Sequence, residues 1–263
     1  MAVALTDIGT GPPLVLLHGW AVDRSFFGRQ MPLARQGYRL LAPDLPGHGE
    51  RASAGGPATM AALADDLADL LAAEHLEGAV LVGWSMGAML ALELLARGPT
   101  PALAGLVIVD MSPRIANDAE WRHGLAGGQD MDETRAAADR MHRHWGDYAG
   151  RIARSMFAEG SEGDDGLVAD ATSRIAARDP ALMAGYWRSL AEADHRATVA
   201  RLSVPVLAIA GGRSRLYRSG VATWIAATAP QGHAITLPDA GHAPHLEQPD
   251  AFNATVARFA AGL

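Results

Sequence analysis

The stretch Ala79-Val80-Leu81-Val82-Gly83-Trp84-Ser85-Met86-Gly87 joins a short apolar run to a helical pattern that continues to Arg97. So short a turn between strand and helix strains the serine backbone, and side chains in place of the flanking glycines would collide with neighbouring elements. The turn lifts the serine hydroxyl off the sheet and directs helix N-terminal N–H groups at a developing oxyanion. A G-x-S-x-G pentapeptide occurs by chance in roughly one chain in ten of this size. Its position between strand and helix nevertheless predicts a nucleophile at Ser85, rather than an ordinary glycine-rich turn.

Around this turn, short apolar runs alternate with helical patterns. The predicted strands are Leu14–Leu17, Tyr38–Pro43, Ala79–Val82, Leu106–Val109, Val204–Ala210 and His233–Leu237. The predicted helices are Ser25–Gln36, Thr59–His75, Met86–Arg97, Gly220–Ala229 and Asp250–Ala261. Nearly continuous apolar strands are typical of a parallel sheet that is covered on both faces. The alternation therefore predicts an α/β fold with a doubly wound, mostly parallel sheet.

Between Ser112 and about Arg201 the pattern contains helices without strands, and this stretch is too long for an ordinary connection. We therefore divide the chain into a core, residues 1–111 and 202–263, and a helical cap, residues 112–201, that covers a pocket. The alternative is a set of helices that only covers the sheet edge.

Composition excludes several classes of function. The 263 residues include no cysteine, so disulfides, thiolate metal sites and a cysteine nucleophile are excluded. The net charge is −7, which disfavours nucleic acid as a partner. The first residues lack the pattern of a secretory signal, and no apolar run reaches the roughly 18 residues that span a bilayer. We expect a cytoplasmic protein without a membrane partner.

Two further motifs fit a nucleophilic serine. Leu14–Leu17 runs directly into His18-Gly19-Trp20, where a backbone N–H of Trp20 would complete an oxyanion hole with the N–H of Met86. Near the end of the chain, Asp239-Ala240-Gly241-His242 places a histidine on a loop after a strand, preceded by small residues. We expect His242 to be the general base, with His245 as the competing candidate.

Together with Asp44-Leu45-Pro46-Gly47-His48-Gly49, these motifs make the chain resemble the α/β-hydrolase superfamily from end to end. The resemblance implies a serine–acid–histidine order, a helical cap inserted after the sixth strand, and no cofactor. The entry Leu-Leu-His-Gly-Trp and the elbow Gly-Trp-Ser-Met-Gly look most similar to the pimeloyl-carrier-protein methyl ester esterase group. Asp44 and His48 are expected to shape a loop rather than to catalyse.

The acid departs from the family pattern. Relatives usually carry it on the loop after the strand that corresponds to Val204–Ala210, but at that position this chain has Ser214. One interpretation is that the acid has moved to Asp110, at the end of Leu106–Val109, a position that carries the acid in some superfamily members. The other is that Asp110 is structural and the enzyme is weakened. We favour the moved acid, because the carboxyl ends of both strands meet at one edge of the sheet. Asp239 is too close in sequence to His242 to orient it easily.

Large apolar side chains suggest a pocket, although any helical insertion also needs a core. The candidates for binding substrate are Trp20, Met86, Trp145, Tyr148, Phe157 and Trp187, with Trp121, Met156, Met183 and Tyr186 as further cap residues. The predicted cap, residues 112–201, also carries a group of basic residues: Arg135, Arg140, Arg143, Arg151 and Arg154. These form either a solvated helix surface or, as the methyl esterase resemblance suggests, a docking site for an acidic acyl-carrier protein.

We therefore expect a serine-dependent carboxylic ester hydrolase that acts on a small or medium acyl ester through an acyl-enzyme, with Ser85, His242 and Asp110 as the catalytic residues. Two alternatives on the same fold remain open: a cofactor-free dioxygenase, and a ligand-sensing receptor with vestigial hydrolase activity. We expect no metal, because neither the pair His142 and His144 nor the pair His242 and His245 has a convincing third ligand.

Overall fold

The computed structural model describes residues 4–98, 102–158 and 165–263. Its sheet has seven strands in the order β1-β3-β2-β4-β5-β6-β7, and only β1 runs antiparallel to its neighbour. The strands are β1 Leu5–Ile8, β2 Pro13–Leu17, β3 Arg39–Pro43, β4 Ala79–Trp84, β5 Leu103–Val109, β6 Val206–Gly211 and β7 Gly232–Leu237. The predicted doubly wound, mostly parallel sheet is confirmed. The strand β1 was missed, because it has only four residues, of which Thr6 and Asp7 are polar, and it lies at the edge of the sheet.

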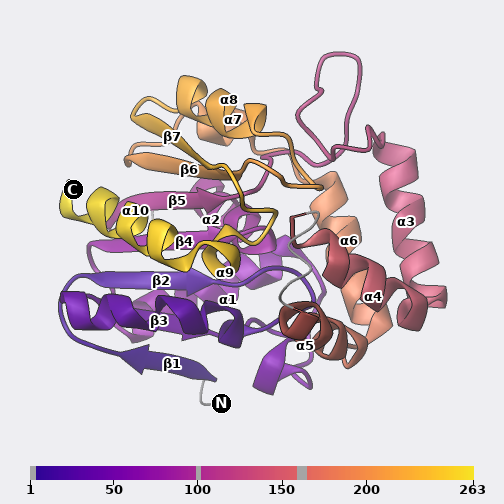
Figure 1. Cartoon of the computed structure of the whole chain (residues 1–263), viewed down its shortest axis with the longest axis horizontal. Helices are drawn as coiled ribbons and strands as arrows, with labels where there is room; N and C mark the ends of the chain where they lie inside the picture. The colour runs from indigo at the N-terminus through magenta and orange to yellow at the C-terminus, as the bar shows by residue number, and fades with distance from the viewer. Residues whose placement is uncertain (1–3, 99–101, 159–164) are drawn as a thin grey trace.

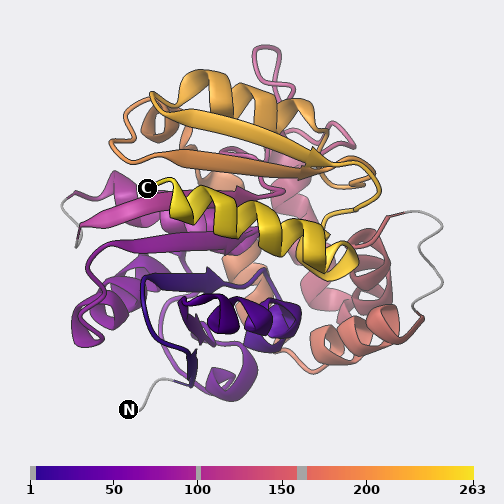
Figure 2. The same cartoon turned by 60° about the vertical axis from the view of Figure 1, so that its left-hand side comes forward.

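Helices cover both faces of the sheet. The 3₁₀ helix η1 (Arg24–Gln36) and the helix α10 (Pro249–Ala261) lie on one face, and α1 (Met60–Ala73) and α2 (Met86–Ala96) lie on the other (Figures 1 and 2). The remaining core elements are η2 Gly49–Arg51, α8 Gly220–Thr228 and α9 Pro244–Glu247. The central strands β4 and β6 are buried along their whole length, so the core lies between these two helical layers.

Helix α1 shows how the sequence pattern produces this packing. Its N-cap Thr59 accepts a hydrogen bond from the backbone N–H of Ala62, which satisfies one free donor of the first turn. Leu63 and Leu67 are buried one turn apart, as the apolar periodicity requires, whereas Asp65 is exposed. The predicted amphipathic helix is therefore confirmed.

The segment between β5 and β6 contains helices and no strand in its described parts. These are α3 Met131–Arg143, α4 Trp145–Ser155, α5 Asp165–Ala176, α6 Pro180–Glu192 and α7 Arg196–Val199. The segment follows the fifth strand of this chain rather than the sixth, since five strands precede it. Helices α4 to α6 lie beyond the carboxyl ends of the parallel strands (Figure 1). None of the described helices is long and apolar enough to cross a membrane.

Candidate active site

Ser85 occupies the turn between β4 and α2 in a strained conformation, with φ 54° and ψ −119°. The two flanking glycines are required by close packing. A Cβ at Gly83 would lie 2.5 Å from the backbone of Ala88, and a Cβ at Gly87 would lie 2.1 Å from the carbonyl oxygen of Leu17. Helix α2 begins at the next residue, Met86, so its free N–H groups start beside the serine. The turn predicted from the pentapeptide is present.

Asp110 follows the last residue of β5 and is itself in the left-handed region, at φ 43°. Its backbone N–H donates to the carbonyl of Ile209 in β6 at 2.7 Å, which continues the pairing of the two strands. Its carboxylate accepts the backbone N–H of Gly211 at Oδ1, 2.9 Å away, and contacts Nδ1 of His242 through Oδ2 at 2.8 Å. Both side chains are buried, so the pair is shielded from water. The structure thus brings together the predicted acid and base positions.

Ser214, which the family resemblance placed at the usual position of the acid, is part of the same cluster. Its hydroxyl donates to Oδ2 of Asp110 at 2.6 Å. Within the described part of the chain, Asp239 makes no hydrogen bond or ion pair with His242, and the imidazole is oriented by Asp110 instead.

The loop that carries His242 is fixed from both sides. The indole N–H of Trp84 donates to the carbonyl of His242 at 2.7 Å, and the backbone N–H of Gly241 donates to Oε2 of Glu247 at 2.7 Å. The competing histidine, His245, is completely buried against Trp84, with ring centroids 4.5 Å apart, and burial lowers its pKa to about 3. His245 packs against Trp84 and does not line the cavity that contains Ser85, whereas His242 does. This arrangement favours His242 as the base.

Two buried histidines support the loop after β2. Nε2 of His18 accepts the backbone N–H of Leu45 at 3.0 Å, and Nε2 of His48 accepts that of Ala21 at 3.2 Å. The Nδ1 atom of each ring lies within 2.9 Å of a backbone carbonyl oxygen. Because Nε2 accepts a hydrogen bond, Nδ1 carries the hydrogen and donates it to that carbonyl. Burial lowers the pKa of His18 and holds that of His48 well below its ordinary value, so both rings are neutral.

This support places Trp20 next to the serine. A Cβ at Gly19 would lie 3.4 Å from the Cβ of Ser85, so the backbone of this loop passes directly beside the elbow. Asp44 accepts the backbone N–H groups of Arg24 and Glu50, at 2.9 and 2.8 Å, and ties the adjoining turn together. The expectation that Asp44 and His48 shape a loop agrees with these contacts.

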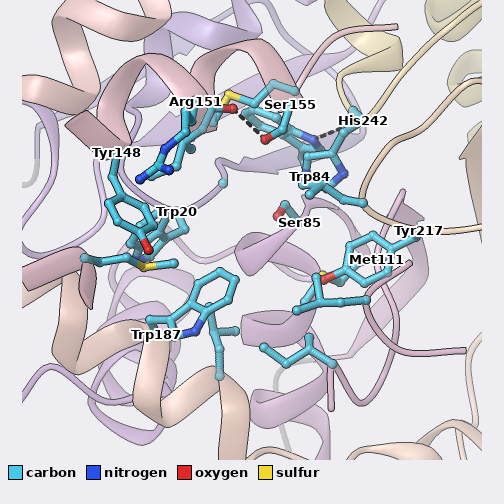
Figure 3. Close-up of a pocket in the computed structure, with 18 residues that line it drawn as sticks. Trp20, Trp84, Ser85, Met111, Tyr148, Arg151, Ser155, Trp187, Tyr217 and His242 are labelled. Carbon is cyan, nitrogen blue, oxygen red and sulfur yellow. Dashed lines mark hydrogen bonds between the residues drawn. The ribbon is translucent and has the colours of Figure 1, made fainter. Parts of the chain in front are cut away.

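A cavity of about 340 Å³ opens over Ser85, and His242 lies in its wall. Figure 3 shows Trp20, Tyr148 and Trp187 on one side of Ser85 and Met111, Tyr217 and His242 on the other. The rest of the wall is mainly apolar; it comprises Gly19, Trp84, Ile115, Leu125, Met141, Arg151, Ile152, Ser155, Met156, Leu190 and Leu216. The site combines a serine, an imidazole–carboxylate pair and a mainly apolar pocket. These are the groups that acyl transfer requires.

Three of the six predicted substrate residues, Trp20, Tyr148 and Trp187, line this cavity. The other three are buried around it: Met86 begins α2, Trp145 packs edge-on against Trp20 and donates to the carbonyl of Ile175, and Phe157 lies behind the His242 loop. Of the further cap residues, Met156 lines the cavity, whereas Trp121, Met183 and Tyr186 are core residues. Met111, Leu216 and Tyr217 were not anticipated, because loops from the core supply them and no helical periodicity marks their direction.

Residues 14–255 match a model of the alpha/beta hydrolase family. The chain belongs to this family.

Relatives in this family are similar along nearly the whole chain. A pimeloyl-[acyl-carrier protein] methyl ester esterase of Xanthomonas campestris pv. campestris is 32% identical over 267 residues, covering 97% of this chain and 98% of the relative. The protein of the same name from Chromobacterium violaceum is 29% identical over 252 residues, covering 96% and 95%. An esterase structure from Thermogutta terrifontis has a TM-score of 0.84 at 30% identity, covering 98% of this chain and 92% of that one.

An esterase from Exiguobacterium antarcticum has the same fold, with a TM-score of 0.90 at 20% identity over 98% of this chain and 95% of that one. The predicted family, fold and enzyme class are confirmed: the chain is a carboxylic ester hydrolase of the alpha/beta hydrolase family.

The predicted basic residues lie on α3 and α4, above the cavity. All five are exposed: Arg135, Arg140, Arg143, Arg151 and Arg154. Arg151 lies over the ring of Tyr148, 4.2 Å from its centroid, and lines the cavity itself. Arg140 lines a second cavity of about 370 Å³ that shares five residues with the first: Leu125, Met141, Tyr148, Trp187 and Leu216. The cavity over Ser85 and the cavity beside Arg140 are therefore adjacent.

Proposed function

We propose that the protein hydrolyses carboxylic esters through an acyl-enzyme on Ser85. The observation that carries the proposal is the buried contact of 2.8 Å between His242 and Asp110, in the wall of the cavity that also contains Ser85. An imidazole held at Nδ1 by a carboxylate leaves Nε2 to act as a general base. The strained elbow supports the assignment, because conformational strain of this kind is retained where function requires it.

In the first step, Nε2 of His242 takes the hydroxyl proton while Oγ of Ser85 attacks the ester carbonyl carbon. The backbone N–H groups of Trp20 and Met86 stabilise the resulting oxyanion. The bond to the alkoxy oxygen then breaks, and the alcohol leaves with the proton from the imidazolium. Water, deprotonated by the same imidazole, attacks the acyl carbon. The bond from that carbon to Oγ of Ser85 then breaks, Oγ takes the proton back from the imidazolium, and the carboxylic acid is released. Asp110 stabilises the imidazolium in both halves of the reaction.

Labelling and turnover together test this mechanism. Wild-type protein should react with a fluorophosphonate probe and hydrolyse p-nitrophenyl esters, whereas Ser85→Ala should do neither. Ser219→Ala is the matched control, because Ser219 is exposed beside α8 and its side chain makes no capping hydrogen bond. Ester hydrolysis that survives in Ser85→Ala would refute the role of Ser85. Labelling of the wild type without turnover would indicate a receptor. Absence of both labelling and turnover would indicate a cofactor-free dioxygenase.

We further propose that helices α3 to α7 form the cap and that the substrate is an acyl group on a carrier protein. The support is that exposed arginines of α3 and α4 adjoin the site: Arg151 lines the cavity over Ser85, and Arg140 lines the adjacent cavity. These arginines form a basic face on a chain whose net charge is −7. Such a face complements an acidic carrier and raises the rate of encounter with it. The relatives named as methyl ester esterases of an acyl-carrier protein add further support.

Charge reversal at Arg143 and Arg154 tests docking, because both are exposed and neither lines the cavity. The double variant R143E/R154E should lower kcat/KM for a carrier-bound methyl ester about tenfold, since each exposed ion pair contributes roughly 0.2–1 kcal/mol. Hydrolysis of p-nitrophenyl butyrate should not change. The control is Arg258→Glu on α10, which is exposed outside the capping segment. Equal loss with both substrates, or equal loss in the control, would contradict docking at this face.

A further inference from the structure

The hydroxyl of Ser214 makes three hydrogen bonds that fix the position of its hydrogen. Oγ accepts the backbone N–H groups of Leu216 and Tyr217, both at 3.3 Å, and lies 2.6 Å from Oδ2 of Asp110. A hydroxyl has one hydrogen and two lone pairs. Because the two backbone donors occupy the lone pairs, the hydrogen is directed at Asp110.

The same reasoning fixes the proton of the imidazole. Oδ2 of Asp110 accepts the Ser214 hydroxyl, and Oδ1 accepts the backbone N–H of Gly211 at 2.9 Å. Hydrogen bonds donated to both oxygens favour the ionised form of a carboxyl group, which acts only as an acceptor. Nδ1 of His242, 2.8 Å from Oδ2, is then the donor, and Nε2 is left without a proton.

We propose that Ser214 is a positioning residue, which holds the Asp110 carboxylate ionised and aimed and thereby fixes His242 in the tautomer that can accept a proton from Ser85. This inference rests on the proposed acyl-enzyme mechanism. It gives a role to Ser214, whose hydroxyl donates to the carboxylate that orients His242.

Sharing one oxygen has a measurable consequence. Ser214 and His242 both donate to Oδ2 of Asp110. Each hydrogen bond therefore weakens the other hydrogen bond to the same oxygen. Without the hydroxyl, Asp110 binds the imidazolium more strongly, and the histidine must lose its proton at higher pH before it can act as a base. The acid limb of the pH–rate profile is therefore expected to move upward.

The other groups that face His242 do not produce this shift. The ring of Tyr217 packs at 5.8 Å, and burial raises the pKa of its phenol, so it is uncharged. His245 is neutral, with its pKa lowered to about 3. Arg151 reaches the cavity from α4, and Glu247 binds the backbone at Gly241. Replacing Ser214 changes none of these four side chains; the backbone N–H of Tyr217 loses its partner in the Ala and Val variants and keeps it in the Thr variant.

The test is the pH dependence of kcat/KM for p-nitrophenyl butyrate in two pairs of variants. Ser214→Ala should lower kcat about tenfold, the effect of losing one hydrogen bond to a charged group, and move the acid limb upward by about 0.5 pH unit. Ser214→Thr keeps the hydroxyl and should restore the wild-type limb, whereas Ser214→Val, of equal size, should behave like Ala. Ser219→Ala is the control for the loss of a serine, and thermal melting checks that each variant is folded.

An Ala or Val profile that coincides with the wild type would overturn the proposal, as would a Thr variant that shifts as far as Val. The Thr and Val pair keeps the test decisive if Ser214→Ala does not fold. The outcome is separable from the acyl-enzyme mechanism, because labelling of Ser85 by a fluorophosphonate tests that mechanism independently of position 214.

Discussion

Replacement of His245 by leucine removes a buried titratable group without removing the packing around it. The imidazole is completely buried and packs against the rings of Trp84, Phe27 and Phe252, with centroid separations of 4.5, 5.0 and 5.8 Å. Both ring nitrogens are buried without a hydrogen-bond partner within the described part of the chain. A buried polar atom without a partner costs about 1–3 kcal/mol. Leucine has a similar volume and no such atoms, so the variant should be as stable as the wild type, or more so, at pH 7.

The effect should grow as the pH falls. Burial lowers the pKa of His245 in the folded state to about 3, against 6.5 in the unfolded chain. Protonation therefore favours the unfolded state: the contribution to stability is complete above pH 6.5 and is lost progressively as the pH falls from 6.5 towards 3. At pH 5 these two values give a loss of about 2 kcal/mol. The leucine variant escapes this loss, although other buried histidines still contribute theirs.

Urea unfolding of both proteins at pH 7 and pH 5 measures the difference. The stability of the variant relative to the wild type should rise by about 2 kcal/mol between the two pH values. The control is His142→Leu on α3, where the side chain is exposed and the relative stability should not change with pH. Equal acid sensitivity of His245→Leu and wild type would refute the reasoning. Ester hydrolysis should persist in the variant, since His245 does not line the cavity.

Three other substitutions test the site. Asp110→Asn should lower kcat about 10⁴-fold with little change in KM, because the amide cannot stabilise the imidazolium; steady-state kinetics would show a smaller loss if the acid lay elsewhere. Trp84→Phe removes the N–H that donates to the carbonyl of His242 at 2.7 Å, and urea unfolding should show a loss of about 1–3 kcal/mol together with a lower kcat. Gly87→Ala would place a Cβ 2.1 Å from the carbonyl oxygen of Leu17. It should destabilise the fold by about 1–3 kcal/mol and reduce activity at least tenfold, and unchanged melting would contradict the packing described.

The assignment of the acid shows how much of the site could be predicted from the sequence. Ser214 at the usual acid position raised the question, and the ends of β5 and β6 supplied the answer that Asp110 could replace it. What the sequence left open was the role of Ser214 itself. Its contact with Asp110 joins residues 104 positions apart, and no local pattern encodes so distant a pairing.

The cavity wall was harder to predict than the catalytic residues. Aromatic residues in a helical insertion serve either the pocket or the core of the insertion, and composition does not separate the two roles. Trp187 and Trp145 were equally plausible, but only Trp187 lines the cavity, because the indole of Trp145 is turned towards the carbonyl of Ile175. Such choices depend on the rotation of each helix about its axis, which packing against neighbouring helices decides.

The sequence by itself determined the fold class, the serine elbow and the histidine loop of this protein. Each depends on local physics: apolar runs make buried strands, the glycines beside Ser85 permit a turn that other residues would block, and helical periodicity separates buried from wet faces. Tertiary structure alone decided how the Asp110 carboxylate meets His242, which way the hydroxyl of Ser214 points, and which aromatic rings line the cavity. These features require contacts between residues far apart in the chain, so their geometry exists only after the sheet and the helical segment have packed together.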